Sequence, residues 1–294
     1  MNIIRLIGGL GNQMYDYALY VAMREKGRQV KLHEFVADAV DTWNTTITRG
    51  SLLGCFPSVK FEFASEQEVQ KMCGDNSNII SRALRHFNLP FGYKEKLYRE
   101  TNPAEINLQI LDMDNIYFDG YWQHAGYFEN VTDKLKDDFV FQKSTKPEDV
   151  RALEQIQGSN SVGVHVRRGD YLKTPDLYGG ICTEAYYKEA FEIMRGMVSD
   201  PHFFFFTDDP HWVKKQFKLK NMLIVDWNDS TAESWRDMRL MSFCQHNIIA
   251  NSSFSWWAAW LNDNQNKSVI SPARWEYGKP MAAYRRMKNW IYLE

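Results

Sequence analysis

The sequence predicts an α/β fold with two Rossmann-like domains, whose parallel sheets would face one another across a central cleft. Two observations carry this prediction. Short apolar runs alternate with amphipathic segments at both ends of the chain, which is typical of strand–helix–strand units in parallel sheets. The chain has 294 residues, which is long for one hydrophobic core and natural for two domains. The polar, proline-containing stretch 142–147 predicts a linker, so we expect domains over residues 1–145 and 146–294.

The amino-terminal end of the chain has the pattern of one strand–helix–strand unit. Residues 3–7 form an apolar run typical of a strand, and residues 8–13 are a glycine-rich turn. In residues 14–26 apolar side chains recur four positions apart, which predicts a helix that ends at Gly27. Residues 29–34 then predict a second strand, so this end of the chain starts a parallel sheet.

The rest of the first domain is harder to interpret. Residues 36–113 mix Gly, Pro, Asn and short apolar runs without a sustained period, so we expect helices and loops there. After this stretch, residues 115–121 predict a strand and residues 133–139 predict a short helix.

The second half alternates more regularly, which favours a doubly wound parallel sheet. Thr183 and Asp209 are predicted to cap helices that begin directly after them. Ser230 starts a capping box for a helix through Phe243, and residues 255–261 predict a further helix. The predicted strands cover residues 162–166, 203–206, 222–226, 247–250 and 267–271.

The overall composition excludes several classes of protein. The formal net charge is −2, with 35 Lys and Arg against 37 Asp and Glu, whereas a nucleic-acid-binding protein usually has a basic excess. No apolar run approaches the length of a membrane span, and the first residues are strand-like rather than a signal peptide. The 4 cysteines are scattered without a CxxC pair. We therefore expect a cytoplasmic protein with free thiols that binds no nucleic acid.

The strand over residues 162–166 is followed at once by Arg167 and Arg168. In an open parallel sheet, ligands bind just beyond the carboxyl ends of the strands. This strand would therefore present two guanidinium groups, which are planar, always charged and shaped to grip phosphate. An isolated pair of arginines would be expected in structural salt bridges, but the adjacent Gly169 and Asp170 favour an anion site.

Two further strands of this domain end in polar side chains at the same predicted edge. Asp208 and Asp209 follow one strand, and their carboxylates can accept hydrogen bonds from the N–H groups of a guanine base. Ser253 and Ser255 follow another, at a helix start whose backbone N–H groups suit a phosphate. Asp209 and the two serines have a plainer interpretation as helix caps. The convergence of cations, acceptors and a helix start still predicts a pocket for a nucleoside diphosphate.

The glycine-rich turn of the first domain carries a weaker signal. Gly9 and Gly11 begin a GxGxxG pattern, but Met14 stands at the third glycine position, and no GxxxxGK[ST] sequence is present. A glycine turn between a strand and a helix is often only a tight connection. The adjacent Asn12 and Gln13 are polar at a helix start, which favours contact with a sugar or a phosphate.

A metal site has little support in the sequence. Asp112 and Asp114 match a DxD pattern that holds a divalent metal in another class of sugar-nucleotide enzymes, but such a tripeptide is common by chance. The 7 histidines show no metal-binding spacing. We therefore expect no metal, and keep as an alternative a metal-dependent transferase that uses these two aspartates.

Four segments together resemble the bacterial α-1,2-fucosyltransferases of glycosyltransferase family 11, in their order and spacing. Residues 120–123 are also similar to that family, and the likeness spans residue 3 to about residue 275. The arginine motif alone is shared with α-1,6- and protein O-fucosyltransferases, so the combination is the specific signal. The four segments are residues 8–14 (GGLGNQM), 165–171 (HVRRGDY), 207–209 (TDD) and 251–257 (NSSFSWW). Small departures at Tyr15, Thr207 and Ala258 remove no charged group.

The resemblance implies a GT-B fold, GDP-β-L-fucose as the donor, a β-galactoside as the acceptor, and inversion to an α-1,2 linkage. It implies that no metal or other cofactor is required, since GDP-fucose is a substrate. Arg167 matches the family's phosphate-binding arginine, where it would stabilise charge on the departing GDP, and Arg168 and Asp170 complete the expected catalytic residues. The implied substrate-binding residues are Gly9, Gly11, Asn12, Gln13, His165, Asp208, Asp209, Asn251, Ser253, Phe254 and Ser255.

Several alternatives stay open at this point. Asp170 is either the general base on the acceptor hydroxyl or a structural partner of an arginine. Arg168 either helps Arg167 at the phosphate or holds the loop through Asp170. Lactose, N-acetyllactosamine, lacto-N-biose and a lipid-linked O-antigen or capsule unit are all acceptors that the sequence permits, and we expect residues 36–113 to choose among them. A lipid-linked acceptor would bring the protein to the inner face of the membrane as a peripheral protein. A non-catalytic protein that binds nucleotides or glycans is the remaining alternative.

Overall fold

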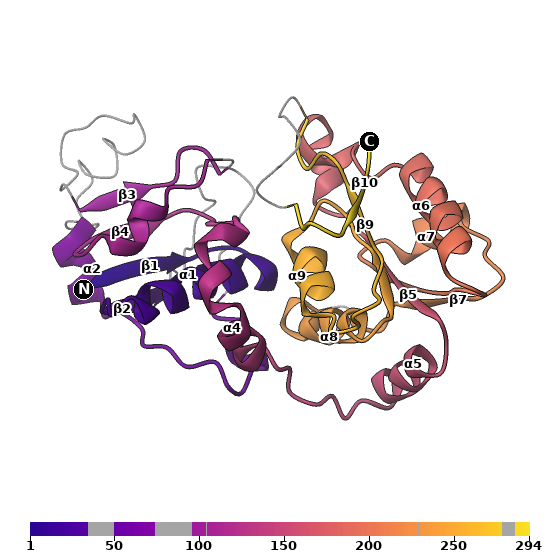
Figure 1. Cartoon of the computed structure of the whole chain (residues 1–294), viewed down its shortest axis with the longest axis horizontal. Coiled ribbons are helices and arrows are strands. Elements are labelled where there is room, and N and C mark those ends of the chain that lie inside the picture. Colours follow the sequence, from indigo (N-terminus) through magenta and orange to yellow (C-terminus); the bar gives the residue numbers. More distant parts are fainter. Residues whose placement is uncertain (35–49, 74–95, 104, 229, 278–285) are drawn as a thin grey trace. The chain divides into compact units, whose positions relative to one another are not determined.

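The computed structural model describes residues 1–34, 50–73, 96–103, 105–228, 230–277 and 286–294. They form two compact α/β units, Met1–Val140 and Phe141–Glu294, coloured indigo to magenta and magenta to yellow in Figure 1. Each unit has an all-parallel sheet, which confirms the predicted class of two Rossmann-like domains. The boundary expected after residue 145 lies a few residues beyond the division between the units.

The described residues of the first unit form four parallel strands in the order β2-β1-β4-β3. β1 is central, and its fully buried Ile3 and Ile4 explain why this strand has a nearly continuous apolar sequence. The strands are β1 (Asn2–Leu6), β2 (Val30–Glu34), β3 (Leu97–Arg99) and β4 (Tyr117–Asp119).

Helix α1 (Leu10–Glu25) joins β1 to β2, and every residue from Gln13 to Met23 is buried. The helix begins at Leu10 rather than at residue 14 as predicted. Gly8 makes the turn with φ of 73°, and the carbonyl of Gly9 already accepts hydrogen bonds from the backbone N–H groups of Asn12 and Gln13. The second part of the glycine-rich segment is therefore the first turn of the helix. The other helical elements that the structure describes in this unit are η1 (Leu53–Cys55), α2 (Glu66–Cys73), η2 (Leu108–Asp112), η3 (Ala125–Tyr127), η4 (Glu129–Val131) and α4 (Thr132–Asp138).

The stretch 36–113, where we expected only helices and loops, contributes a strand as well. β3 lies at the edge of the sheet, and its Leu97 is in register with Tyr117 of β4. Three residues are too few to show the alternation of a strand, so the expectation is wrong for residues 97–99 because pairing with β4 decides their conformation. Residues 36–49 and 74–95 of this stretch lie outside the described residues.

In the second unit, the part of the chain that the structure describes contains six parallel strands in the order β10-β9-β8-β5-β6-β7. β5 is fully buried along its length, as the valine-rich run predicts, while β10 was not predicted from the sequence. The strands are β5 (Ser161–Val166), β6 (His202–Thr207), β7 (Met222–Val225), β8 (His246–Ile248), β9 (Val269–Pro272) and β10 (Ile291–Leu293).

The predicted helix starts of the second unit are confirmed at two positions. The side chain of Thr183 accepts from the N–H of Tyr186, and Oδ1 of Asp209 accepts from the N–H of Trp212 at 3.0 Å. Ser230 also caps, but it opens the short 3₁₀ helix η7 (Thr231–Glu233), and the α-helix starts afterwards. The other helical elements are α5 (Pro147–Gln157), η5 (Tyr171–Lys173), the π-helix η6 (Pro175–Gly179), α6 (Glu184–Met197), α7 (Pro210–Gln216), α8 (Trp235–Ser242) and α9 (Ser253–Leu261).

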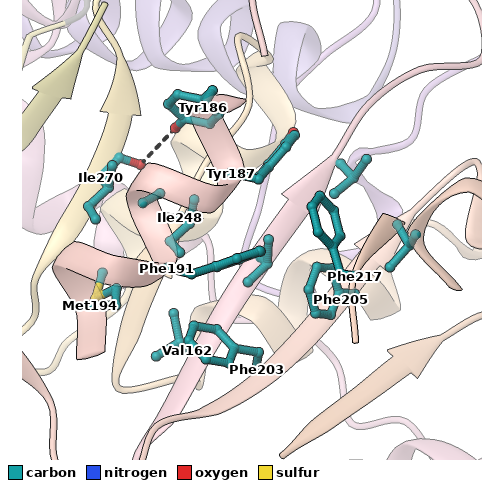
Figure 2. Close-up of a cluster of buried hydrophobic side chains, with 14 of the residues drawn as sticks. Val162, Tyr186, Tyr187, Phe191, Met194, Phe203, Phe205, Phe217, Ile248 and Ile270 are labelled. Carbon is teal, nitrogen blue, oxygen red and sulfur yellow. Dashed lines mark hydrogen bonds between the residues drawn. The ribbon is translucent and has the colours of Figure 1, made fainter. Parts of the chain in front are cut away.

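An aromatic core packs against one face of the second sheet and holds β5 in place (Figure 2). The ring of Phe191 on α6 lies 5.0 Å from that of Phe203 on β6 and 5.2 Å from that of Phe217, measured between centroids. The hydroxyl of Tyr186 donates to the carbonyl of Ile270, which ties the same helix to β9. Each buried ring stabilises the fold by roughly 1.5–3 kcal/mol, so this packing fixes the position of the carboxyl end of β5. No helix within the described residues has the length and apolar character to span a membrane.

Candidate active site

Three of the predicted site segments meet at one edge of the second sheet. β5 lies between β8 and β6, and all three strands run parallel. Val166 at the end of β5 is in register with Thr207 at the end of β6, so the arginines that follow the first strand lie beside the aspartates that follow the second. The predicted convergence at this carboxyl edge is therefore present in the structure.

Arg167 is held between two carboxylates. Its Nη1 lies 3.1 Å from Oδ2 of Asp208, and its Nη2 donates to Oδ2 of Asp170 at 2.8 Å. Burial alone would lower the pKa of Arg167, but the two aspartates outweigh it, so its pKa is raised and the side chain stays charged. With 36% of the side chain exposed, the guanidinium is both oriented by its partners and open to a ligand.

Arg168 is placed differently, because it stacks on an aromatic ring. Its guanidinium carbon lies 4.2 Å from the ring centroid of Trp212, and its Nε donates to Oδ2 of Asp209 at 3.1 Å. Its backbone N–H donates to Oδ1 of Asp208 at 2.8 Å. These contacts use Arg168 largely to fix the loop, one of the two roles that the sequence left open. The contact of Trp212 with Arg168 was not predicted from the sequence, although Trp212 lies in the first turn of a helix whose cap was predicted.

The two aspartates after β6 are both engaged with the arginine loop. Asp208 accepts from the side chain of Arg167 and from the backbone of Arg168, while Asp209 caps α7 and pairs with Arg168. Burial alone would raise the pKa of Asp209, but the N–H of Trp212 and the guanidinium of Arg168 keep this pKa below its usual value. A contact with guanine, as predicted from the sequence, would add to these bonds.

His165 is the penultimate residue of β5 and lies on the face opposite the aromatic core. It is 6% exposed, and its Nδ1 lies 2.9 Å from Oγ of Ser255 on α9. Burial, with a contribution from the positive charge of Arg167, lowers the pKa of His165 to about 3, so the ring is neutral. The ring of Phe254 flanks the imidazole, with 5.4 Å between the centroids.

The start of α9 is held by Asn251, which is 3% exposed. Its Nδ2 donates to the carbonyls of Trp275 and Tyr178 at 3.0 and 3.3 Å, and its own carbonyl accepts from the hydroxyl of Tyr171. These bonds tie together the loops that follow β5, β8 and β9. Asn251 is thus a structural hub of the site rather than an exposed ligand contact.

The three residues that follow it divide between surface and interior. Ser253 and Phe254 are half-buried at the first turn of α9, where backbone N–H groups suit an anion. Ser255 is fully buried. Its hydroxyl therefore has no exposed surface with which to meet a phosphate directly, in contrast to the role we predicted from the sequence.

In the first unit, the glycine turn and the loop after β4 are joined by amide groups. Nε2 of Gln123 donates to Oδ1 of Asn12 at 2.8 Å. Gln13 is 1% exposed and binds the backbone of Gly8, Gly50 and Leu52, so its amide holds a neighbouring segment. Gly9 is half-buried at the turn and Gly11 is buried within α1. Gln123 lay in a segment that the resemblance covered, but its bond to Asn12 was not foreseen.

Asp112 and Asp114 lie on the surface of the first unit in separate ion pairs. Both carboxylate oxygens of Asp112 accept from Lys26 at 2.8 Å, and Oδ1 of Asp114 accepts from the amino terminus at 2.9 Å. These cations lower the pKa of both groups. Within the described ranges, no cluster of three or more His, Cys, Asp or Glu side chains could hold a metal ion.

Comparison with known proteins agrees with the geometry of the second unit. The family model described as Glycosyl transferase family 11 matches residues 68–294. An alpha-1,2-colitosyltransferase of Escherichia coli is 31% identical over 302 residues, which cover 99% of this chain and 98% of that protein. The O-antigen biosynthesis glycosyltransferase WbnK of Escherichia coli is 28% identical over 305 residues, which cover 98% of this chain and 99% of that protein.

Among solved structures, that of the fucosyltransferase NodZ from Bradyrhizobium aligns with this chain at a TM-score of 0.51. The two are 14% identical, and the alignment covers 87% of this chain and 91% of the other. At this identity the likeness shows the fold alone. The GT-B class expected from the sequence is thereby confirmed.

Proposed function

This chain belongs to glycosyltransferase family 11, and we propose that it transfers L-fucose from GDP-β-L-fucose to the 2-hydroxyl of a terminal β-galactoside. The product would be an α-1,2 linkage, formed with inversion and without a metal. The relative named for O-antigen biosynthesis supports a surface glycan as the natural product, with a lipid-linked oligosaccharide at the inner membrane face as the acceptor. Lactose serves as a soluble test acceptor in this proposal.

The observation that carries the proposal is the position of Arg167. Its guanidinium lies at the carboxyl end of β5, is partly exposed, and is oriented by Asp170 and Asp208. As the bond between fucose and GDP breaks, negative charge grows on the β-phosphate. A cation that is already oriented there stabilises the transition state more than the ground state, because no reorganisation is needed.

The neighbouring groups would support that arginine. Asp170 accepts from Nη2 of Arg167, so we assign it to positioning Arg167 rather than to removing the acceptor proton. The first turn of α9, with Ser253 and Phe254, would bind the diphosphate through backbone N–H groups. Asp208 and Asp209 would accept from guanine on lone pairs that their arginine bonds leave available.

One observation favours a second donor. The identity of 31% to an alpha-1,2-colitosyltransferase extends over 99% of this chain, which makes GDP-colitose the main competitor of GDP-fucose. Colitose is L-fucose without its 3-hydroxyl, so both sugars present the same leaving group to Arg167. A site built to hydrogen-bond that hydroxyl would reject colitose strongly, whereas a site that only accommodates the ring would accept both.

The test incubates purified protein with lactose and either GDP-fucose or GDP-colitose, with and without excess EDTA. The product is identified by mass and by linkage analysis. A fucose linked to position 2 of galactose, formed equally with EDTA, supports the proposal in full. Transfer only from GDP-colitose would mean that colitose, and not fucose, is the sugar transferred. Loss of activity in EDTA would favour the metal-dependent transferase that uses Asp112 and Asp114. GDP binding without transfer to any β-galactoside would instead indicate a binding protein.

A further inference from the structure

His165 is the penultimate residue of β5, and Arg167 follows directly after the last residue of that strand. Because side chains alternate along a strand, His165 points away from the aromatic core, which takes Val162, Val164 and Val166. The helix α9 packs there, and Ser255 reaches His165 from it. A buried imidazole thus stands directly beside the guanidinium that we assign to the leaving diphosphate.

A neutral imidazole carries one proton, and its partner decides which nitrogen holds it. Oγ of Ser255 has three acceptors within reach: Nδ1 of His165 at 2.9 Å, the carbonyl of Ser252 at 3.3 Å and the carbonyl of Ala250 at 3.4 Å. The contact with the ring is the shortest and the only one near the preferred length for an O–H donor. If the serine donates its proton through this contact, Nδ1 is the acceptor and the ring proton is left on Nε2.

The other ring nitrogen, Nε2, is the one that remains available to a ligand. Within the described residues, the hydrogen-bond contacts of the His165 side chain end at Nδ1, while its backbone carbonyl accepts from Tyr187. His165 is 6% exposed, and the ring of the half-buried Phe254 lies beside its ring, with 5.4 Å between the centroids. An N–H donor at this place would meet the same oxygens as Arg167.

We infer that Ser255 is a positioning residue that fixes His165 in the Nε2–H tautomer, so that His165 donates a neutral hydrogen bond to the leaving diphosphate. This inference deepens the proposed function and rests on it. It also explains why a serine that was expected at the phosphates is turned into the interior. A neutral donor beside Arg167 adds stabilisation without the repulsion that a second cation would bring.

The primary test reads the tautomer directly. Protein labelled with nitrogen-15 histidine is examined by long-range proton–nitrogen correlation, with His165→Gln used to assign the signal. We expect the Nε2–H form in the wild-type protein, and a shift toward Nδ1–H or a mixture in Ser255→Ala. The Nδ1–H form in wild-type protein would overturn the inference, as would a tautomer that does not respond to Ser255→Ala.

The second test measures donor kinetics in Ser255→Ala. We expect kcat to fall about ten-fold with little change in donor KM, since a neutral hydrogen bond that forms in the transition state is weakened. The matched control is Ser161→Ala, which removes a buried serine hydroxyl at the other end of β5 that accepts from the N–H of Gln245. Equal losses in the two variants would reduce Ser255 to a structural role.

The two proposals fail separately. The tautomer is read in protein without substrate, and GDP binding is measured by calorimetry without any transfer. If GDP binds and the tautomer is Nε2–H but no β-galactoside accepts a sugar, the proposed function fails and the arrangement of Ser255 and His165 stands. If transfer is normal and the tautomer is Nδ1–H, only the inference fails.

Discussion

The two units of this protein use the same local design, a loop between a parallel strand and a helix, with opposite chemistry. In the second unit, the loop after β5 carries two arginines that are paired with three aspartates. In the first unit, the turn after β1 leads into the first turn of α1, which carries Asn12 and Gln13. The amide of Asn12 binds Gln123, and the amide of Gln13 binds the backbone.

The difference between charged and neutral side chains indicates which kind of ligand each segment fits. Fixed cations with carboxylate partners suit a diphosphate, whose charge grows during the reaction. Amides offer both donors and acceptors without charge, which suits the hydroxyls of a sugar. The segment after β5 is thus charged and the segment after β1 is neutral. The following variants test whether the two segments bind different ligands.

The largest effect is expected from Arg167→Ala. This variant should lower kcat/KM by roughly 3 kcal/mol or more, about a hundred-fold to a thousand-fold, because an oriented cation at the leaving group is lost. The measurement is initial rate against GDP-sugar concentration. Arg151→Ala is the control, since Arg151 on α5 is exposed and pairs with the surface residue Glu148 at 3.5 Å. Near-normal turnover in Arg167→Ala would end the assignment of a charged donor site.

Asp208→Asn should have the next largest effect. The amide keeps the shape of the side chain but loses the charge that orients Arg167, so we expect a loss of about 2 kcal/mol in kcat/KM. Asp226→Asn is the matched control, because Asp226 follows the adjacent strand β7 and pairs with the exposed Lys214. If the two variants behave alike, the position of Arg167 does not depend on Asp208.

Acid should destabilise the second unit through His165. Its pKa is about 3 in the folded protein and near 6.5 when unfolded, so below pH 6.5 the unfolded chain binds the proton that the folded chain rejects. The free energy of unfolding should fall by about 1 kcal/mol between pH 7.5 and 5.5 from this group alone. Urea titrations of wild type and His165→Gln at both pH values check it, and an identical pH dependence in both would refute the buried neutral ring.

Trp212→Leu should weaken nucleotide binding modestly. Arg168 loses the ring at 4.2 Å, which is worth about 1 kcal/mol, or roughly a five-fold rise in the Kd for GDP by calorimetry. Phe243→Leu serves as the control, since this exposed ring lies 5.1 Å from Arg239 outside the site. An unchanged Kd would show that the ring does not help to hold the loop.

The smallest effect is expected in the first unit, from Asn12→Ala and Gln123→Ala. Each should raise the acceptor KM about two-fold to five-fold, with the donor KM unchanged, because a neutral hydrogen bond is lost. The double variant should cost less than the sum, since the two amides bind each other. A rise in donor KM instead would break the comparison between the two loops.

Much of the second unit could be predicted because its signals are local. The alternation of strands and helices, the caps at Thr183 and Asp209 and the buried β5 all follow from short-range pattern. β3 and β10 were missed, since strands of three residues have no pattern of their own and exist through pairing with β4 and β9. The early start of α1 was missed because glycine is a poor helix former that tertiary packing overrode.

The sequence by itself determined that cations, carboxylates and a helix start would come together at one edge of a parallel sheet. Only the tertiary structure decided what each group does there. Asp208 meets Arg167, and Ser255 turns inward to His165, across separations of 41 and 90 residues. Such partnerships depend on strand order and register, which are set by packing over the whole sheet rather than by neighbouring residues.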